Sequence, residues 1–170
     1  LPMGTNMLQD YPDSKAFIDK IAVAIPDAPQ EFLHTQSFLK SYSRKSEATY
    51  RSYRNEVERL LLWSWTVANK SIVSLRRADL EAYFDFVHSP PANWVALSVA
   101  DRFRPIDGQS RQNQSWRPFV VKIAKQDRRK ALDNGLTMPA TTSGHSLSHE
   151  AMKICYSALS CYYDYLTDES

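Results

Sequence analysis

The sequence predicts an all-α fold, a small helical bundle of about six or seven helices. Apolar residues recur at the spacing that places them on one face of a helix, and no stretch shows the convincing alternation of a strand. The chain has 170 residues, of which 43% are hydrophobic and 24% charged, with only four glycines. This composition is typical of one soluble domain, and it excludes a collagenous or fully disordered protein.

The N-terminal part, residues 1–28, is predicted to be an arm and a short helix. The first ten residues carry little pattern, so we expect them to form a flexible arm. From 14 to 25 the apolar positions follow helical spacing, and Pro26 then ends the helix.

The clearest helix is predicted from 46 to 68, after another helix at 30–42. Ser46 is a favourable N-cap, and apolar residues then recur along one face. The opposite face carries Arg51, Arg54, Asn55, Glu58 and Arg59, and we expect its basic N-terminal half to be exposed.

The remaining predicted elements are shorter and alternate with polar loops. Proline pairs, glycine-containing turns and serine caps mark their ends. We expect helices at 79–87, 94–103 and 116–132, loops at 105–115 and 137–144, and a final helix capped by Ser146 or Ser148 and running to 166.

Few residues are available for catalysis or metal binding. Cys155 and Cys161 lie on one predicted helix about 9 Å apart, too far for a disulfide, so we expect packed free thiols. His145 and His149 share a helix face, but no glutamate stands between them and no third ligand is near. The four glycines form no phosphate-binding motif. We therefore expect no catalytic residue, no metal and no cofactor.

Positive charge is concentrated in two stretches, although the formal net charge is only +2. Residues 102–130 hold nine lysines and arginines against two aspartates, and residues 40–54 hold five against one glutamate. Such blocks are typical of proteins that bind the phosphate backbone of nucleic acids, although they also occur on ordinary solvated faces.

Three segments together carry a family pattern. Phe38–Tyr42 is followed by Ser46-x-x-Thr49-x-x-x-Tyr53 and then by an apolar run that ends at Trp65. A polar turn and an Asp-Leu pair open the helix within 74–83, and the last helix, 157–166, closes on an aromatic run and Tyr-Leu. In this order they resemble the N-terminal core-binding domain of phage integrases and tyrosine recombinases.

The resemblance implies a SAM-like helical domain at 29–170, with an extended insertion at about 92–144, that lies across one face of DNA. It implies a non-catalytic DNA-binding domain of a site-specific recombinase, which holds the duplex for strand exchange by a C-terminal catalytic domain that we expect to be absent here. The family's catalytic domain contains a His-x-x-Arg pair, and none of the four histidines is followed by Arg at the third position. The implied partners are double-stranded DNA and other recombinase protomers in a synaptic complex.

Three stretches provide candidate DNA contacts. Phosphates are bound by cations, hydroxyls and the free N–H groups of helix starts, which coincide at the start of the 46–68 helix. We expect contacts from Arg44, Lys45, Ser46, Thr49, Arg51 and Arg54 there, from Arg111, Arg117, Lys122 and Lys125 in the insertion, and from His145, Ser146 and Lys153 at the last helix. The tryptophans, Trp63, Trp65, Trp94 and Trp116, are expected in the core.

The cellular setting follows from what the sequence lacks. Its longest apolar runs are far shorter than a membrane-spanning helix requires, and it shows no secretion-signal pattern. We therefore expect a cytoplasmic protein without a membrane partner. The alternative function is a helical protein-interaction module with a basic surface, and salt-sensitive binding to duplex DNA would distinguish the two.

Overall fold

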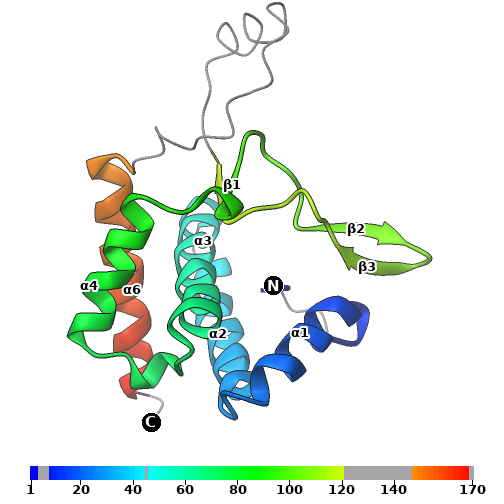
Figure 1. Ribbon diagram of the computed structural model, residues 1–170, viewed down its shortest axis with the longest axis horizontal. Helices are drawn as coiled ribbons and strands as arrows, with labels where there is room; N and C mark the ends of the chain where they lie inside the picture. Colours follow the sequence, from blue (N-terminus) through cyan, green and yellow to red (C-terminus); the bar gives the residue numbers. More distant parts are fainter. Residues whose placement is uncertain (4–7, 45, 121–146, 169–170) are drawn as a thin grey trace, which may run out of the picture.

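The computed structural model describes residues 1–3, 8–44, 46–120 and 147–168. Within these ranges the chain is mostly helical, which confirms the main feature of the predicted fold class. The described residues form five α-helices rather than six or seven, and they also form four short strands in two separate sheets. Figure 1 shows a helical body from which one β-hairpin projects.

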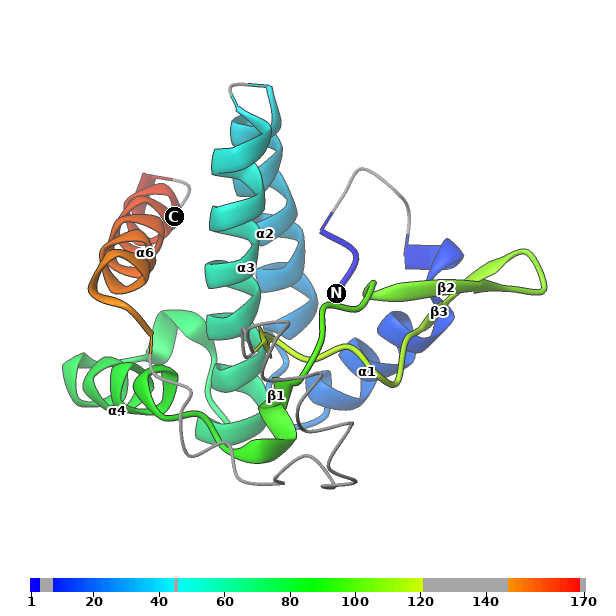
Figure 2. The same ribbon diagram turned by 90° about the horizontal axis from the view of Figure 1, so that it is seen from above.

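The centre of the bundle is the pair α2 (Ala28–Ser43) and α3 (Glu47–Trp63). The two helices lie side by side in both ribbon views (Figures 1 and 2). They confirm the helices predicted at 30–42 and 46–68, although the last turns of the second, Ser64–Ala68, are a π-helix. The apolar stripe of α3, which includes Leu61, is buried because its residues share one helix face.

Helix α6 (His149–Asp168) packs against this pair. Its Tyr162 is buried and lies 5.1 Å from Phe38 of α2, measured between ring centroids. Phe38 also stacks on Tyr53 of α3 at 6.3 Å. One aromatic cluster therefore joins the first and the last of the three segments of the family pattern.

Helix α4 (Arg77–His88) confirms the helix predicted at 79–87. The Asp79 carboxylate accepts a hydrogen bond from the backbone N–H of Arg76 at 2.9 Å, which caps the helix start. The helix stops just before Pro90 and Pro91, as the sequence predicts, because a residue that precedes proline disfavours helical geometry.

The N-terminal segment is partly different from the prediction. Helix α1 (Pro12–Ala22) confirms the predicted short helix. The first ten residues are not a flexible arm throughout, because Leu1 and Met3 are only 9% and 2% exposed and belong to the main core. Three residues are too few to show periodicity, so their burial leaves no pattern in the sequence.

The segment 92–120 differs most from the prediction. Two strands, β1 (Val95–Ala96) and β4 (Phe119–Val120), pair in parallel. Two others, β2 (Phe103–Ile106) and β3 (Gln109–Gln112), form an antiparallel hairpin. The helix predicted at 94–103 and the start of the one at 116 are therefore wrong, as is the loop across 105–112; residues 121–146 lie outside the described ranges.

The hairpin has a local cause in its turn. Asp107 and Gly108 have φ values of 52° and 75°, which two-residue hairpin turns require. Asp-Gly is one of the dipeptides that best adopts this geometry, because glycine has no steric penalty there and aspartate tolerates it. The prediction missed the hairpin because the flanking residues are polar and lack apolar alternation.

A buried carboxylate joins α2 to the chain beyond α3. Glu31 is 6% exposed, and its two oxygens accept hydrogen bonds from Trp65 Nε1 at 2.7 Å, Ser71 Oγ at 2.5 Å and the Ile72 backbone N–H at 2.7 Å. These bonds compensate the cost of removing the carboxylate from water.

Candidate nucleic-acid interface

The start of α3 combines a helix end, hydroxyl groups and cations. Ser46 has an extended backbone, and its Oγ accepts a hydrogen bond from the Thr49 backbone N–H at 3.4 Å. Other N–H groups of the first turn have no helical acceptor, and they form the positive end of the helix dipole. Figure 2 shows this end of the α2–α3 pair extending away from α1 and α4.

The residues predicted at this helix start are largely on the surface. Arg44 and Ser46 are exposed, and Arg44 makes no ion pair with any described residue. Arg51 is 73% exposed and pairs with Glu47 at 2.5 Å. Thr49 is half-buried, and Lys45 lies outside the described residues. Positive charge is therefore present here, and one carboxylate balances part of it.

Arg54 does not lie on an exposed face, contrary to the prediction. It is half-buried, and its Nη2 donates a hydrogen bond to the carbonyl of Leu1 at 3.4 Å. Burial and the nearby charge of Arg102 lower the pKa of its guanidinium. This face of α3 is covered by the N-terminal residues and by the insertion, so it is not free to meet DNA.

The same covering buries Glu58, which lies further along this face of α3. Its side chain is 1% exposed and accepts hydrogen bonds from Arg102 Nε at 2.7 Å and from the Leu1 amino group at 2.5 Å. Burial alone raises the pKa of Glu58, but the Leu1 amino group, Arg102 and Arg54 outweigh it and lower the pKa. Glu58 therefore remains ionised inside the molecule.

The second predicted region lies on strands and loops rather than on a helix. Arg111 of β3 pairs with Asp13 of α1 at 2.9 Å. Arg117 is half-buried, and its Nη1 donates to the carbonyls of Gln114 at 2.6 Å and Trp116 at 2.8 Å. Lys122 and Lys125 lie outside the described residues.

The third predicted region is only partly described. Lys153 is 59% exposed in the first turns of α6 and pairs with Glu150 at 3.0 Å. Ser148 caps the helix, because its Oγ accepts a hydrogen bond from the Ala151 backbone N–H at 3.2 Å. It is one of the two residues that the sequence predicted as the cap. His145 and Ser146 lie outside the described residues.

The structure does not bring the three regions onto one surface. Figure 2 shows the β2–β3 hairpin and α6 on opposite sides of the α2–α3 pair, with the start of α3 at its far end. Among the described residues, two exposed cations, Arg44 and Arg51, lie at the start of α3, and one, Lys153, lies at the start of α6.

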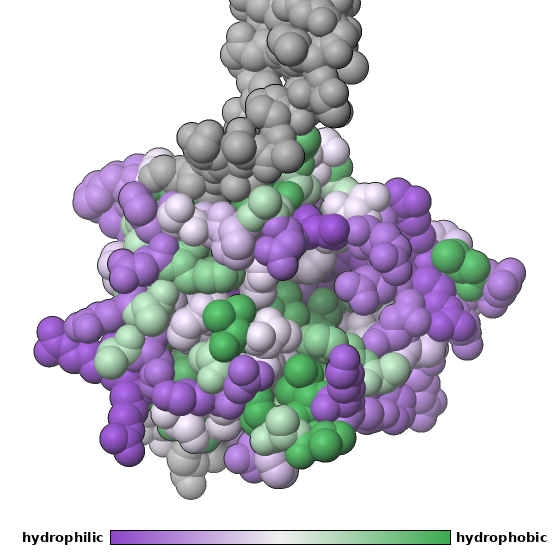
Figure 3. All heavy atoms as spheres, viewed as in Figure 1, coloured by the Kyte–Doolittle hydropathy of each residue, from purple (hydrophilic) through white to green (hydrophobic). Residues whose placement is uncertain are grey.

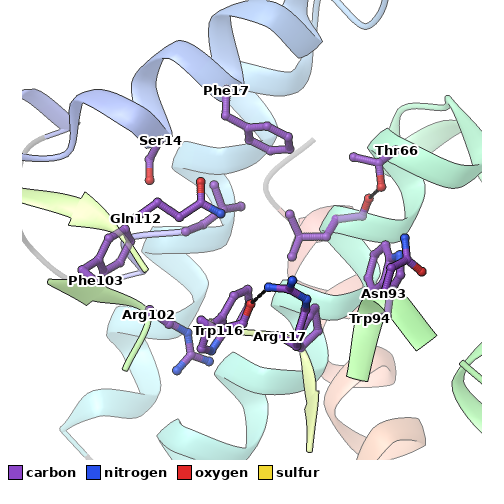
Figure 4. Close-up of a pocket in the computed structure, with 13 residues that line it drawn as sticks. Ser14, Phe17, Thr66, Asn93, Trp94, Arg102, Phe103, Gln112, Trp116 and Arg117 are labelled. Carbon is purple, nitrogen blue, oxygen red and sulfur yellow. Dashed lines mark hydrogen bonds between the residues drawn. The ribbon is translucent and has the colours of Figure 1, made fainter. Parts of the chain in front are cut away.

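A cavity of about 270 Å³ lies between α1, the end of α3 and the insertion. Figure 4 shows the side chains that surround it. Its walls carry the rings of Phe17, Trp94, Phe103 and Trp116, and its described lining includes two arginines, Arg102 and Arg117, and no acidic residue.

One wall of this cavity is fixed by a chain of contacts from α3. Arg102 donates hydrogen bonds to Glu58 and to Asn55 Oδ1, the latter at 2.7 Å. The carbon of its guanidinium lies 5.1 Å from the Trp116 ring centroid, within the range of a cation–π contact. The ion pair with Glu58 thus fixes the position of the Arg102 guanidinium, and the guanidinium in turn positions the Trp116 ring.

Sequence reasoning missed this cavity. Trp63 and Trp65 are buried in the core as predicted, at 4% and 1% exposure. Trp94 is half-buried and packs against the core, as predicted, and it also lines the cavity. Trp116 is a half-buried cavity residue outside the core cluster, so the prediction that it belongs to the core is wrong. A usable signal was present, since Trp116 stands among the polar residues from Gln112 to Arg117.

The buried groups near Cys155 do not form a reactive thiol site. Cys155 is fully buried beside Glu56 and Tyr83, and burial followed by the charge of Glu56 raises the pKa of its thiol. The thiol is therefore protonated at neutral pH and a poor nucleophile. Cys161 is half-buried, with its Sγ 3.7 Å from the Tyr53 hydroxyl, and both cysteines are free thiols as predicted.

The described residues contain no group of three or more His, Cys, Asp or Glu side chains that could hold a metal ion. In the part of the chain that the structure describes, no helix has the length and apolar character needed to cross a membrane.

Comparisons with protein-family models, with curated proteins and with solved structures found no match to this chain.

Proposed function

We propose that this chain is a DNA-binding domain that contacts the phosphate backbone of a duplex through the start of α3. The observation that carries the proposal is the coincidence of the Ser46 cap with exposed Arg44 and Arg51 at a free helix end. Backbone N–H groups and cations at such an end favour phosphate oxygens by hydrogen bonding and by charge.

The narrower proposal is that this is the non-catalytic DNA-binding domain of a site-specific tyrosine recombinase. Its support is the sequence resemblance of three segments, together with the contacts of Phe38 with Tyr53 and with Tyr162, which join the first of these segments to the last. In this proposal the domain holds the duplex in a complex with other recombinase protomers, and a catalytic domain of the family type supplies the chemistry.

Titration with a fluorescent duplex at several salt concentrations tests the DNA-binding proposal. We expect affinity to fall as salt rises, because phosphate contacts release counterions. The variant Arg44→Ala/Arg51→Ala removes two contacts, so its logarithmic salt slope is expected to be smaller by about 2.

The matched control is Arg76→Ala/Arg77→Ala at the start of α4. These arginines are also exposed at a helix start, and Arg77 pairs with Glu81 one turn away, as Arg51 does with Glu47. The change in net charge is identical, so equal loss by both variants would contradict a specific role for α3. The absence of salt-sensitive duplex binding by the unaltered chain would reject DNA binding altogether.

The second candidate function is a helical protein-interaction module. Two observations favour it. Local carboxylates pair with Arg51, Arg111 and Lys153, which lowers the charge available to DNA. Figure 3 shows hydrophobic residues gathered over the centre and lower part of one face, and the exposed hydrophobic residues include Val23 at 87% and Val73 at 64%.

A further inference from the structure

We propose that the cavity between α1, the end of α3 and the insertion binds an adenine nucleotide, with the base between the aromatic walls and a phosphate on Arg117. This site is separate from the start of α3 and does not rest on the proposed duplex binding. The ligand chemistry is that of a base joined to a phosphate, either as a free nucleotide or at the end of a strand.

The size and walls of the cavity suit one flat ring system. Its volume of about 270 Å³ lies just below the ~300 Å³ at which pockets for larger organic ligands begin. Trp94 and Trp116 offer indole rings, and Phe17 and Phe103 offer two smaller rings. Aromatic side chains stack on nucleobases through their flat faces, and such stacking is a major part of base binding.

The polar groups at the rim match the edge of a base. Asn93 and Gln112 line the cavity with carboxamide side chains that make no hydrogen bond to any other described residue. A carboxamide presents a donor beside an acceptor, which is the arrangement that pairs with the amino group and ring nitrogen of adenine.

The charge of the cavity favours an anion. Figure 4 shows the Arg117 guanidinium on the cavity side of Trp116, while that of Arg102 lies beyond the ring. Arg102 is balanced by Glu58, but Arg117 is held by two backbone carbonyls and has no carboxylate partner among the described residues. Carbonyls orient a guanidinium without cancelling its charge, so Arg117 remains available to a phosphate.

Nuclear magnetic resonance of the whole chain provides an internal control. Adenosine 5′-monophosphate is expected to shift the indole N–H signals of Trp94 and Trp116 and to leave those of Trp63 and Trp65 in place. The two buried rings lie outside the cavity lining. Single Trp→Phe variants assign the four signals.

The role of Arg117 is tested with Arg117→Gln and the matched control Arg104→Gln. Arg104 is exposed on β2 and does not line the cavity. We expect Arg117→Gln to weaken nucleotide binding by about tenfold or more, since a charge-assisted contact is lost, and Arg104→Gln to leave it unchanged. Adenosine without phosphate should bind the unaltered chain about as weakly as the nucleotide binds Arg117→Gln.

Two dinucleotides distinguish the sources of the ligand. The two dinucleotides of deoxyadenosine differ only in that one carries a 5′-phosphate and the other a 5′-hydroxyl. If the phosphorylated dinucleotide binds as tightly as the mononucleotide and the hydroxyl form does not, the ligand is a strand end. If the mononucleotide binds more tightly than both, the ligand is a free nucleotide. The proposal is overturned if the signals of Trp94 and Trp116 do not move, if the two arginine variants behave alike, or if adenosine binds as tightly as its phosphate.

Discussion

Single buried carboxylates determine how the ends of this bundle are joined. Glu31 receives three hydrogen bonds from groups that follow α3, and Glu58 receives its bonds from Arg102 and from the Leu1 amino group. Both carboxylates sit on helices and are nearly inaccessible to solvent. Each therefore holds a segment that lies outside the α-helices and β-strands.

The first prediction concerns Glu31. Glu31→Gln places an amide NH₂ against donors, so at least one of the three hydrogen bonds is lost, and we expect the free energy of unfolding to fall by about 2 kcal/mol or more. Denaturant titration measures the change. The control is Glu47→Gln, whose side chain is 75% exposed and whose substitution should change stability by about 0.5 kcal/mol or less. Equal effects of the two substitutions would mean that the network adds nothing to stability.

At the scale of elements, the carboxylate of Asp13 joins the β2–β3 hairpin to α1. A two-stranded hairpin is marginally stable in water by itself. Asp13 of α1 accepts hydrogen bonds from the Gln112 backbone N–H and from Arg111 Nη1, both at 2.9 Å. The hydrogen bond from Gln112, followed by that from Arg111, lowers the pKa of the Asp13 carboxyl.

The second prediction is that acid loosens this hairpin. Because the pKa of Asp13 is lowered by folding, its contribution is complete above the ordinary aspartate pKa of about 3.9 and is lost as pH falls through the lower folded value. The protection factors of the β3 amides, which are their intrinsic exchange rates divided by the measured rates, should therefore fall at low pH in the unaltered chain. Asp13→Asn should lower these protection factors already at neutral pH and flatten their pH profile.

The control for this experiment is Asp19→Asn. Asp19 is also on α1 but pairs with Lys15 on the helix surface, where both side chains are more than half exposed. Its substitution should leave exchange in β3 unchanged at every pH. An Asp13→Asn variant with the same profile as the unaltered chain would show that the hairpin is held by other contacts.

At the scale of the whole molecule, one core joins the N-terminal residues, the helices and the insertion. Leu1, Leu61, Phe119 and Tyr162 come from distant parts of the sequence and belong to the same buried cluster. Arg59 of α3 contributes a further link, since it donates to the Pro118 carbonyl at 3.0 Å and lies over the Phe119 ring at 4.4 Å. The insertion is thus tied to α3 rather than appended to the bundle.

The third prediction tests this core through α3. Leu61 is fully buried, so Leu61→Ala should reduce the free energy of unfolding by about 2 to 5 kcal/mol, because it leaves a cavity among its neighbours. The control is Leu33→Ala in α2, where the side chain is 49% exposed. This substitution should change the free energy of unfolding by about 0.5 kcal/mol or less. Thermal melting of both variants measures the difference, and an unchanged melting temperature for Leu61→Ala would refute the assignment of this face to the core.

Local patterns in the sequence predicted the five described α-helices and the caps of α3 and α6, but they also predicted a helix at 94–103 that the structure does not contain. Caps and helical periodicity depend on residues within a few turns of one another. This is why the sequence predicted the Ser46 cap, the apolar stripe through Leu61 and the start of α4. The Asp107-Gly108 turn was equally local, but the polar strands beside it concealed the hairpin.

The segments that cover each helix, and the positions of the candidate sites, are known only from the tertiary structure. The burial of Glu58 and Arg54 depends on residues at positions 1–3 and 102, which no spacing along α3 can reveal. Trp94 and Trp116 became cavity walls because the insertion returns to α1 and α3. Contacts of this kind form between segments that are distant in the sequence. They therefore cannot be predicted from the spacing of residues within any one segment.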